Sequence, residues 1–206
     1  CCEVMALSEL FSARSVKTSS DGRNPDPSRD ALDSPACQFT RSRWFEDISI
    51  GEFHVFGTHT FSELEIIEFG QKYAPEVHHT DPVAARDTIH RGIIASGWHI
   101  NAIWMRLMVD YMERFAQGVQ DGRRNGAGVG IKDLVWHQPV RPGHTLTFTY
   151  EIIEKSDRMV RKKWGMIKSR NEAFNQYNEL VMSFTIDILA ELNPKNLSGA
   201  ETEPHA

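Results

Sequence analysis

Two adjacent histidines are the side chains in this sequence best suited to acid–base chemistry. His78 and His79 follow a proline in the segment Tyr73-Ala-Pro-Glu-Val-His-His-Thr-Asp-Pro. The proline predicts a loop, where functional groups concentrate, and an imidazole takes up or releases a proton near neutral pH. We therefore expect His79 to be a general base, with Glu76 and His78 as neighbouring candidates for proton transfer.

A second candidate lies where a long helix is predicted to begin, at Gly97 in the segment Ile94-Ala-Ser-Gly-Trp-His. The first N–H groups of a helix have no partner within the helix, and glycine lets a ligand come close to them. A histidine facing this helix start would set a base opposite an oxyanion donor. We expect the Gly97 N–H to be that donor, and Ile94, Ser96 and Trp98 to contact the substrate. The alternative interpretation is that His79 only hydrogen-bonds the surrounding backbone.

The residues before the histidines predict a strand and a short helix. The segment from Phe53 to Thr60 alternates large and small side chains, which is typical of a strand. Ser62 and Glu65 then have the spacing of a capping box, in which each side chain bonds the other residue's backbone N–H. The helix is expected to run to about Lys72, because Pro75 cannot continue it.

The longest predicted helix carries a broad apolar stripe. It is expected to begin near Gly97 and to end near Gly118. Apolar residues recur along it at spacings of three and four, which indicates a helix packed on the core. The stripe consists of Ile100, Ile103, Trp104, Leu107, Met108, Tyr111, Met112 and Phe115.

Four strands are predicted to follow this helix. In the second of them Leu146, Phe148 and Tyr150 alternate with threonines, the pattern of a half-buried antiparallel strand. One long helix followed by successive strands implies an α+β fold, a sheet wrapped around a helix. The expected strands are residues 128–138, 145–154, 160–171 and 179–189.

The length of 206 residues is that of one domain with tails. Residues 17–42 are rich in Ser, Asp, Pro and Arg and can bury little apolar surface, so residues 1–42 are expected to be a disordered leader. We expect the folded domain to be residues 43–192 and residues 193–206 to be a C-terminal tail.

Charge and cysteine content exclude several classes of partner. The net charge is −5, and the basic run from Arg158 to Lys163 is interrupted by apolar residues, so no nucleic-acid surface is expected. No apolar run is long enough for a membrane span. The cysteines are Cys1, Cys2 and Cys37, and a body without cysteine fits a cytoplasmic location. We expect no metal and no cofactor.

Four motifs, in order, resemble the MaoC-like, (R)-specific enoyl-CoA hydratase family. They are His79-Thr-Asp-Pro, the glycine Gly97, Val135-Trp-His-Gln-Pro-Val-Arg-Pro-Gly-His, and the segment from Asn175 to Met182. The resemblance covers roughly residues 43–192. It implies a single hot-dog fold, an antiparallel sheet around one long central helix, and the activity of a lyase on acyl thioesters.

One position departs from the family pattern. The family's catalytic aspartate lies five residues before its histidine, where this sequence has Ala74. In the family, aspartate and histidine together activate the water that adds to C3 of an enoyl thioester, and a proton is delivered to C2. A methyl group cannot move a proton, so Glu76 is the candidate replacement acid. Asp81 matches an aspartate of the family loop and is expected to be structural.

The resemblance leaves three functions open. The first is a hydratase or dehydratase acting on an acyl-CoA or acyl carrier protein thioester, with His79 as base. The second, favoured by Ala74, is a weakened or non-catalytic subunit that binds acyl thioesters or pairs with an active partner. The third is a thioesterase, which usually needs a carboxylate near the helix N-terminus; it ranks lowest because no Asp or Glu lies between Ile89 and Met108. A lone hot-dog sheet would expose an unpaired edge strand. The resemblance implies that a second hot-dog domain covers this edge, in a homodimer or a hot-dog heterodimer.

Overall fold

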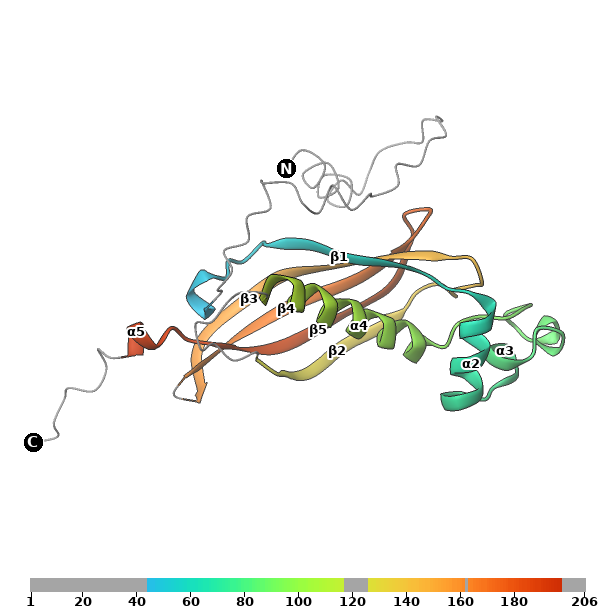
Figure 1. Cartoon of the computed structure of the whole chain (residues 1–206), viewed down its shortest axis with the longest axis horizontal. Helices are drawn as coiled ribbons and strands as arrows, with labels where there is room; N and C mark the ends of the chain where they lie inside the picture. The colour runs from blue at the N-terminus through green and yellow to red at the C-terminus, as the bar shows by residue number, and fades with distance from the viewer. Residues whose placement is uncertain (1–43, 117–125, 162, 198–206) are drawn as a thin grey trace, which may run out of the picture. The chain divides into compact units, whose positions relative to one another are not determined.

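The computed structural model describes residues 44–116, 126–161 and 163–197 (Figure 1). The predicted leader and Gly118 therefore lie outside the described residues, as does the predicted tail beyond residue 197. Residues 194–197 form a short helix, α5 (Pro194–Leu197). Its Asn196 side chain donates a hydrogen bond of 3.0 Å to Glu46, which belongs to the 3-10 turn η2 (Phe45–Asp47).

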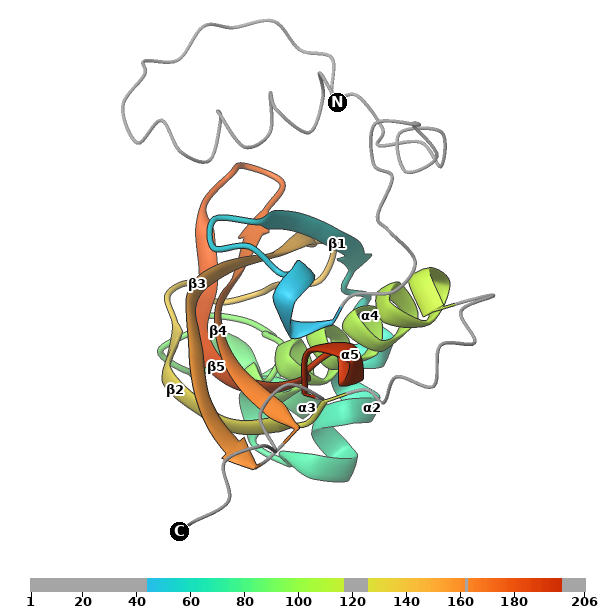
Figure 2. The same ribbon diagram turned by 90° about the vertical axis from the view of Figure 1, so that its left-hand side faces the viewer.

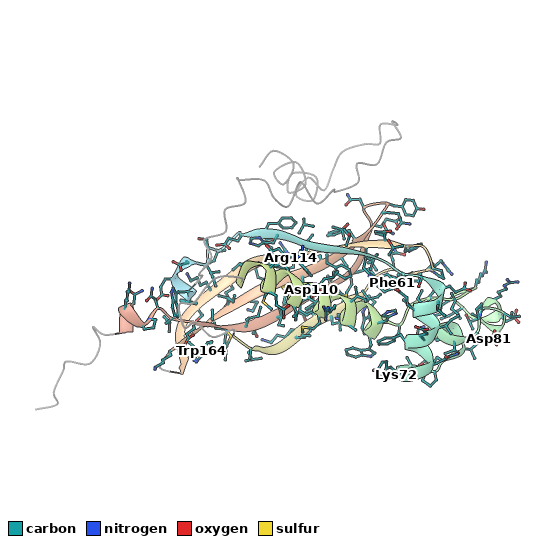
Figure 3. All side chains as sticks on the ribbon, viewed as in Figure 1. Phe61, Lys72, Asp81, Asp110, Arg114 and Trp164 are labelled. Carbon is teal, nitrogen blue, oxygen red and sulfur yellow. The ribbon has the colours of Figure 1, made fainter. Side chains whose placement is uncertain are left out.

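The predicted first strand and first helix are confirmed. Strand β1 (Phe53–Thr60) leads directly into helix α2 (Glu63–Tyr73), and Phe61 lies at their junction (Figure 3). The Ser62 side chain accepts the Glu65 N–H at 3.2 Å, which is half of the predicted capping box. The other half was predicted wrongly: the Glu65 carboxylate accepts a hydrogen bond from His59 Nε2 at 2.7 Å instead.

The long helix α4 (Gly97–Ala116) begins where the sequence predicted it. Its apolar stripe is largely confirmed, since Ile100, Trp104 and Tyr111 are buried in the main core. Met112 is the exception: 44% of its surface is exposed, because the stripe turns away from the sheet near the helix end. Between α2 and α4 lie a single helical turn, α3 (Val77–Thr80), and a 3-10 turn, η3 (Ala84–Asp87).

Four strands follow α4 and join β1 in one antiparallel sheet. They are β2 (Gly128–Trp136), β3 (Thr145–Arg161), β4 (Trp164–Asn175) and β5 (Leu180–Glu191), and the strand order is β1-β3-β4-β5-β2. The long β3–β4 hairpin corrects the prediction that a strand would begin at residue 160, since β3 itself extends that far. The sheet curves around α4 (Figure 2), as the α+β prediction requires.

A buried polar contact ties α4 to the sheet. The Trp104 indole N–H donates to Asn171 Oδ1 of β4 at 3.2 Å, and the Asn171 amide in turn donates to Ser169 Oγ at 3.0 Å. Asn171 is fully buried. Because a buried donor without a partner is costly, this contact holds the helix at one height on the sheet.

Asn171 and Asn101 form a matched pair for testing that contact. Each accepts a tryptophan indole N–H, but Asn101 lies at the surface, where water can replace it. We predict that Asn171→Ala lowers the free energy of unfolding by about 1–3 kcal/mol, whereas Asn101→Ala changes it by less than about 0.5 kcal/mol. Urea denaturation of both variants measures the difference, and equal losses would show that the Trp104 contact does not anchor α4.

Candidate functional site

His79 is held against the segment that leads into α4. Its Nδ1 lies 2.8 Å from the Ile94 carbonyl oxygen, and the Ile94 N–H donates to the His78 carbonyl at 3.0 Å. A carbonyl oxygen only accepts, so Nδ1 must carry the proton. In the neutral imidazole the lone pair is therefore on Nε2, and the ring has the tautomer of a base with one free nitrogen.

The backbone of α2 approaches α3 very closely behind this histidine. A Cβ built on Gly70 would lie 2.6 Å from the His79 carbonyl oxygen and 2.9 Å from the His79 Cβ. Any residue other than glycine would push α3 away from α2. Gly70 therefore sets the depth at which the His79 ring is buried.

The sequence predicted a loop at His79, but His79 lies on the one-turn helix α3. Only 7% of its surface is exposed. Four residues are too few to show a helical periodicity.

Asp81 follows α3, and its Oδ1 accepts the Val83 and Ala84 N–H groups at 2.8 and 3.0 Å. These two bonds lower the pKa of Asp81. The structural role expected for Asp81 matches this turn, which lies beyond α3 (Figure 3).

Glu76 and His78 lie beside the buried histidine. The Glu76 carboxylate is 2.9 Å from His78 Nε2, and the Glu76 side chain is largely exposed. The His78 ring contacts the rings of His79 and His90, with centroids 4.2 and 4.9 Å away. Burial, followed by the nearby His79, lowers the pKa of His78 despite the opposing effect of Glu76. The structure thus brings Glu76, His78 and His79 into one cluster, as the sequence suggested.

Gly97 is the first residue of α4, and Trp136 of β2 packs directly on it. A Cβ on Gly97 would lie 2.3–2.7 Å from three atoms of the Trp136 ring. The Trp136 indole is fixed by its hydrogen bond to Asn101 at 3.1 Å. The expectation that Gly97 leaves its Cα open to a ligand is therefore corrected, because an indole occupies that space. Its N–H has no hydrogen-bond partner among the residues described, as expected for the first residue of a helix.

The three residues expected to contact substrate are placed differently. The Ile94 side chain is buried and its carbonyl is used by His79. Ser96 is also buried, and its carbonyl accepts the first helical N–H groups of α4. Trp98 is 63% exposed and makes an edge contact with Trp136, with ring centroids 5.6 Å apart. Trp98 alone of the three presents its side chain at the surface beside the helix start.

His99 was missed by the sequence reasoning. It lies two residues into α4 and is buried, stacked on Phe69 with ring centroids 4.5 Å apart and in edge contact with Phe61. Its Nδ1 has no hydrogen-bond partner among the described residues. Burial lowers the pKa of His99 to about 4, with Glu65 opposing and His59 and His79 adding to the shift. A histidine on the apolar side of a helix was the signal available in the sequence.

The stability of the protein should therefore depend on pH through His99. The unfolded chain binds a proton at His99 below about pH 6.5, whereas the folded chain does so only near pH 4. The free energy of unfolding is predicted to fall by up to roughly 3 kcal/mol as the pH is lowered across that interval. Urea denaturation at several pH values measures it, and His99→Phe, which keeps the stack on Phe69, should flatten the slope. An unchanged slope in His99→Phe would refute the assignment.

In the described residues, one antiparallel sheet is wrapped around one long helix, an α+β arrangement, and a buried histidine is held beside the start of that helix. The family model described as MaoC like domain matches residues 59–172, so the chain belongs to the MaoC-like family. The match spans the histidine cluster, the whole of α4 and the sheet as far as β4. The fold is the hot-dog fold expected from the sequence.

Solved structures agree with this family. The MaoC-like dehydratase from Rhodospirillum rubrum is 26% identical with a TM-score of 0.64, covering 74% of this chain and 99% of that one. The R-hydratase PhaJ1 from Pseudomonas aeruginosa is 18% identical with a TM-score of 0.55, covering 73% and 86%. The HadBC (3R-hydroxyacyl-ACP dehydratase) complex from Mycobacterium tuberculosis gives 18% identity and a TM-score of 0.54, covering 68% and 96%. A comparison with curated proteins finds no match.

Within the described part of the chain, no helix is both long and apolar enough to cross a bilayer.

Proposed function

We propose that this protein is an acyl-thioester hydratase or dehydratase that uses His79 as its base. The observation that carries the proposal is the hydrogen bond of 2.8 Å between His79 Nδ1 and the Ile94 carbonyl. This bond leaves the Nε2 lone pair free. It also holds the ring beside Ile94, which lies three residues before Gly97, the first residue of α4. The family supports the reaction class, since several structures similar to this chain are described as dehydratases or (R)-hydratases.

In the proposed hydration, His79 Nε2 accepts a proton from a water molecule while the water oxygen adds to C3 of a 2-enoyl thioester. The electron pair of the C2–C3 double bond moves toward the thioester carbonyl, whose oxygen becomes negative. The Gly97 N–H is the proposed donor to that oxygen, because it is a helix N-terminal N–H without a partner in residues 44–116, 126–161 and 163–197, and the helix dipole favours negative charge there. Trp98, exposed beside Gly97, is the proposed contact for the acyl group.

A second group must deliver a proton to C2, and Ala74 cannot do so. Glu76 is the proposed donor. One oxygen of Glu76 and one nitrogen of His79 lie within 4.8 Å of each other, a gap that one water can bridge. After each turnover the proton held by His79 passes to Glu76, so that one water has been added and both groups return to their starting states. Dehydration is the same sequence in reverse.

The proposal predicts hydration of short and medium 2-enoyl-CoA thioesters by the wild-type chain. His79→Gln should lower the rate about 10²–10⁴-fold, since the amide cannot take up a proton. The loss of absorbance of the conjugated thioester measures the reaction. His137→Gln is the matched control, because His137 is a surface histidine bonded to Ser183 and outside the cluster. Unchanged activity in His79→Gln would overturn the site assignment.

The second candidate function is a weakened subunit that binds acyl thioesters, and Ala74 is the observation that favours it. Ala74 ends α2, with its N–H bonded to the Gly70 carbonyl, so its place in the backbone is well fixed. If the wild type is inactive and Ala74→Asp gains hydration activity, this second function is the correct one. The carrier of the acyl group, CoA or acyl carrier protein, is distinguished in the same assay by using both substrates.

We infer further that the chain pairs with a second hot-dog domain through β2. This strand lies at the edge of the sheet, and its apolar side chains are exposed: Val129 by 54%, Ile131 by 48%, Val135 by 45% and Trp136 by 41%. An apolar strand with a free edge favours pairing with another strand. Two structures similar to this chain are described as complexes, HadBC and ChsH1-ChsH2 from Mycobacterium tuberculosis.

A homodimer is therefore predicted at micromolar concentration. The double change Ile131→Lys and Val135→Lys should convert it to a monomer, because two charges would be buried in the interface. The control is Val83→Lys, since Val83 is 72% exposed but lies in the segment after α3, away from β2. Light scattering measures the mass, and a monomeric wild type would contradict the homodimer.

A further inference from the structure

We propose that Glu76, His78 and His79 form a binding site for a divalent cation of the zinc class, and that the bound cation occupies the Nε2 lone pair which hydration would use. Each of the three residues offers one ligand atom, and these atoms all lie within 4.8 Å of one another. Two imidazoles and one carboxylate are a ligand set that zinc accepts, with a fourth position left for water.

The buried member of the set is already oriented as a metal ligand. A histidine that binds a metal through one ring nitrogen almost always donates its other N–H to a carboxylate or a backbone carbonyl. His79 does this, because its Nδ1 is bonded to the Ile94 carbonyl at 2.8 Å. Its Nε2 therefore points its lone pair away from that bond. The close approach of Gly70 to the His79 carbonyl and Cβ fixes the backbone from which the ring projects.

The other two members can move to complete the site. Zinc bonds of about 2.0–2.1 Å in a tetrahedron place ligand atoms roughly 3.3 Å apart. The Glu76 carboxylate and His78 Nε2 already approach to 2.9 Å. The remaining gap is closed by rotation, since 67% of the Glu76 side chain and 23% of the His78 side chain are exposed.

The composition of the cluster selects the class of cation. Imidazole nitrogen suits zinc, nickel and copper, whereas magnesium and calcium prefer sites made wholly of oxygen. Asp81, the nearest further carboxylate along the chain, already accepts two backbone N–H groups with its Oδ1. It stands outside the cluster and is not one of the three proposed ligands.

The functional consequence rests on the proposed function. One lone pair cannot both accept a proton from water and bind a metal ion. If His79 is the base, zinc must inhibit hydration, and the inhibition must follow occupancy of this site. Metal binding itself does not depend on hydratase activity, so the two ideas can fail separately.

Isothermal titration of the untagged full-length protein with Zn²⁺ tests the site. We expect one ion per chain, and we expect Mg²⁺ neither to bind nor to compete. Glu76→Gln and His78→Gln should each weaken Zn²⁺ binding by at least about tenfold. Asp81→Asn is the control for Glu76→Gln, because it removes one carboxylate from the same segment, and His137→Gln is the control for His78→Gln. Both controls should bind Zn²⁺ as the wild type does.

The proposed site is overturned if the wild type binds no zinc, or if the controls weaken binding as much as the cluster variants. The hydration assay is then run with Zn²⁺ and with a chelator. Inhibition by zinc that the chelator reverses supports the shared use of His79. Activity that requires zinc would overturn the inhibitory role. Zinc binding by a chain without any hydratase activity would leave the metal site standing while the proposed function failed.

Discussion

The hydrogen bond between His79 Nδ1 and the Ile94 carbonyl is the interaction on which the candidate site depends. It fixes three properties at once: the position of the ring beside the start of α4, the tautomer, and the nitrogen that remains available. A histidine that merely stabilised this turn would have the same bond. Two further observations go beyond that structural role. One nitrogen of His79 lies within 4.8 Å of ligand atoms of Glu76 and His78. The first N–H of α4 has no hydrogen-bond partner among the described residues.

The rest of the domain holds that bond in place. The glycine at position 70 lets α2 lie close enough to bury His79, and the Trp104–Asn171 contact fixes the height of α4 on the sheet. The indole of Trp136, on the edge strand β2, packs on Gly97 and covers one side of the start of α4. His99 remains uncharged at neutral pH, because an ionised imidazole packed against the rings of Phe69 and Phe61 would be costly to bury.

Sequence patterns predicted the regular elements well, because they arise from local periodicity. β1 was predicted at its observed bounds, and α4 at its first residue. Contacts between segments distant in the sequence left no such signal. The stacking of Trp136 on Gly97 joins residues 39 apart, so the glycine was taken as an opening for a ligand. The single turn α3 is too short for a periodic pattern, so the sequence did not show that Glu76, His78 and His79 bring their polar atoms within 4.8 Å of one another.

The state of the His79 ring is the most direct test of this account. Nitrogen-15 NMR of protein labelled in its histidine rings distinguishes a protonated from a bare ring nitrogen, and the spectrum of His79→Gln assigns the resonances. We predict that, in the neutral ring, Nδ1 carries the proton and Nε2 is bare, and that the Nε2 resonance shifts on addition of Zn²⁺. A proton on Nε2 in the neutral ring would mean that the bond to Ile94 is absent, and it would contradict both the proposed base and the proposed metal ligand.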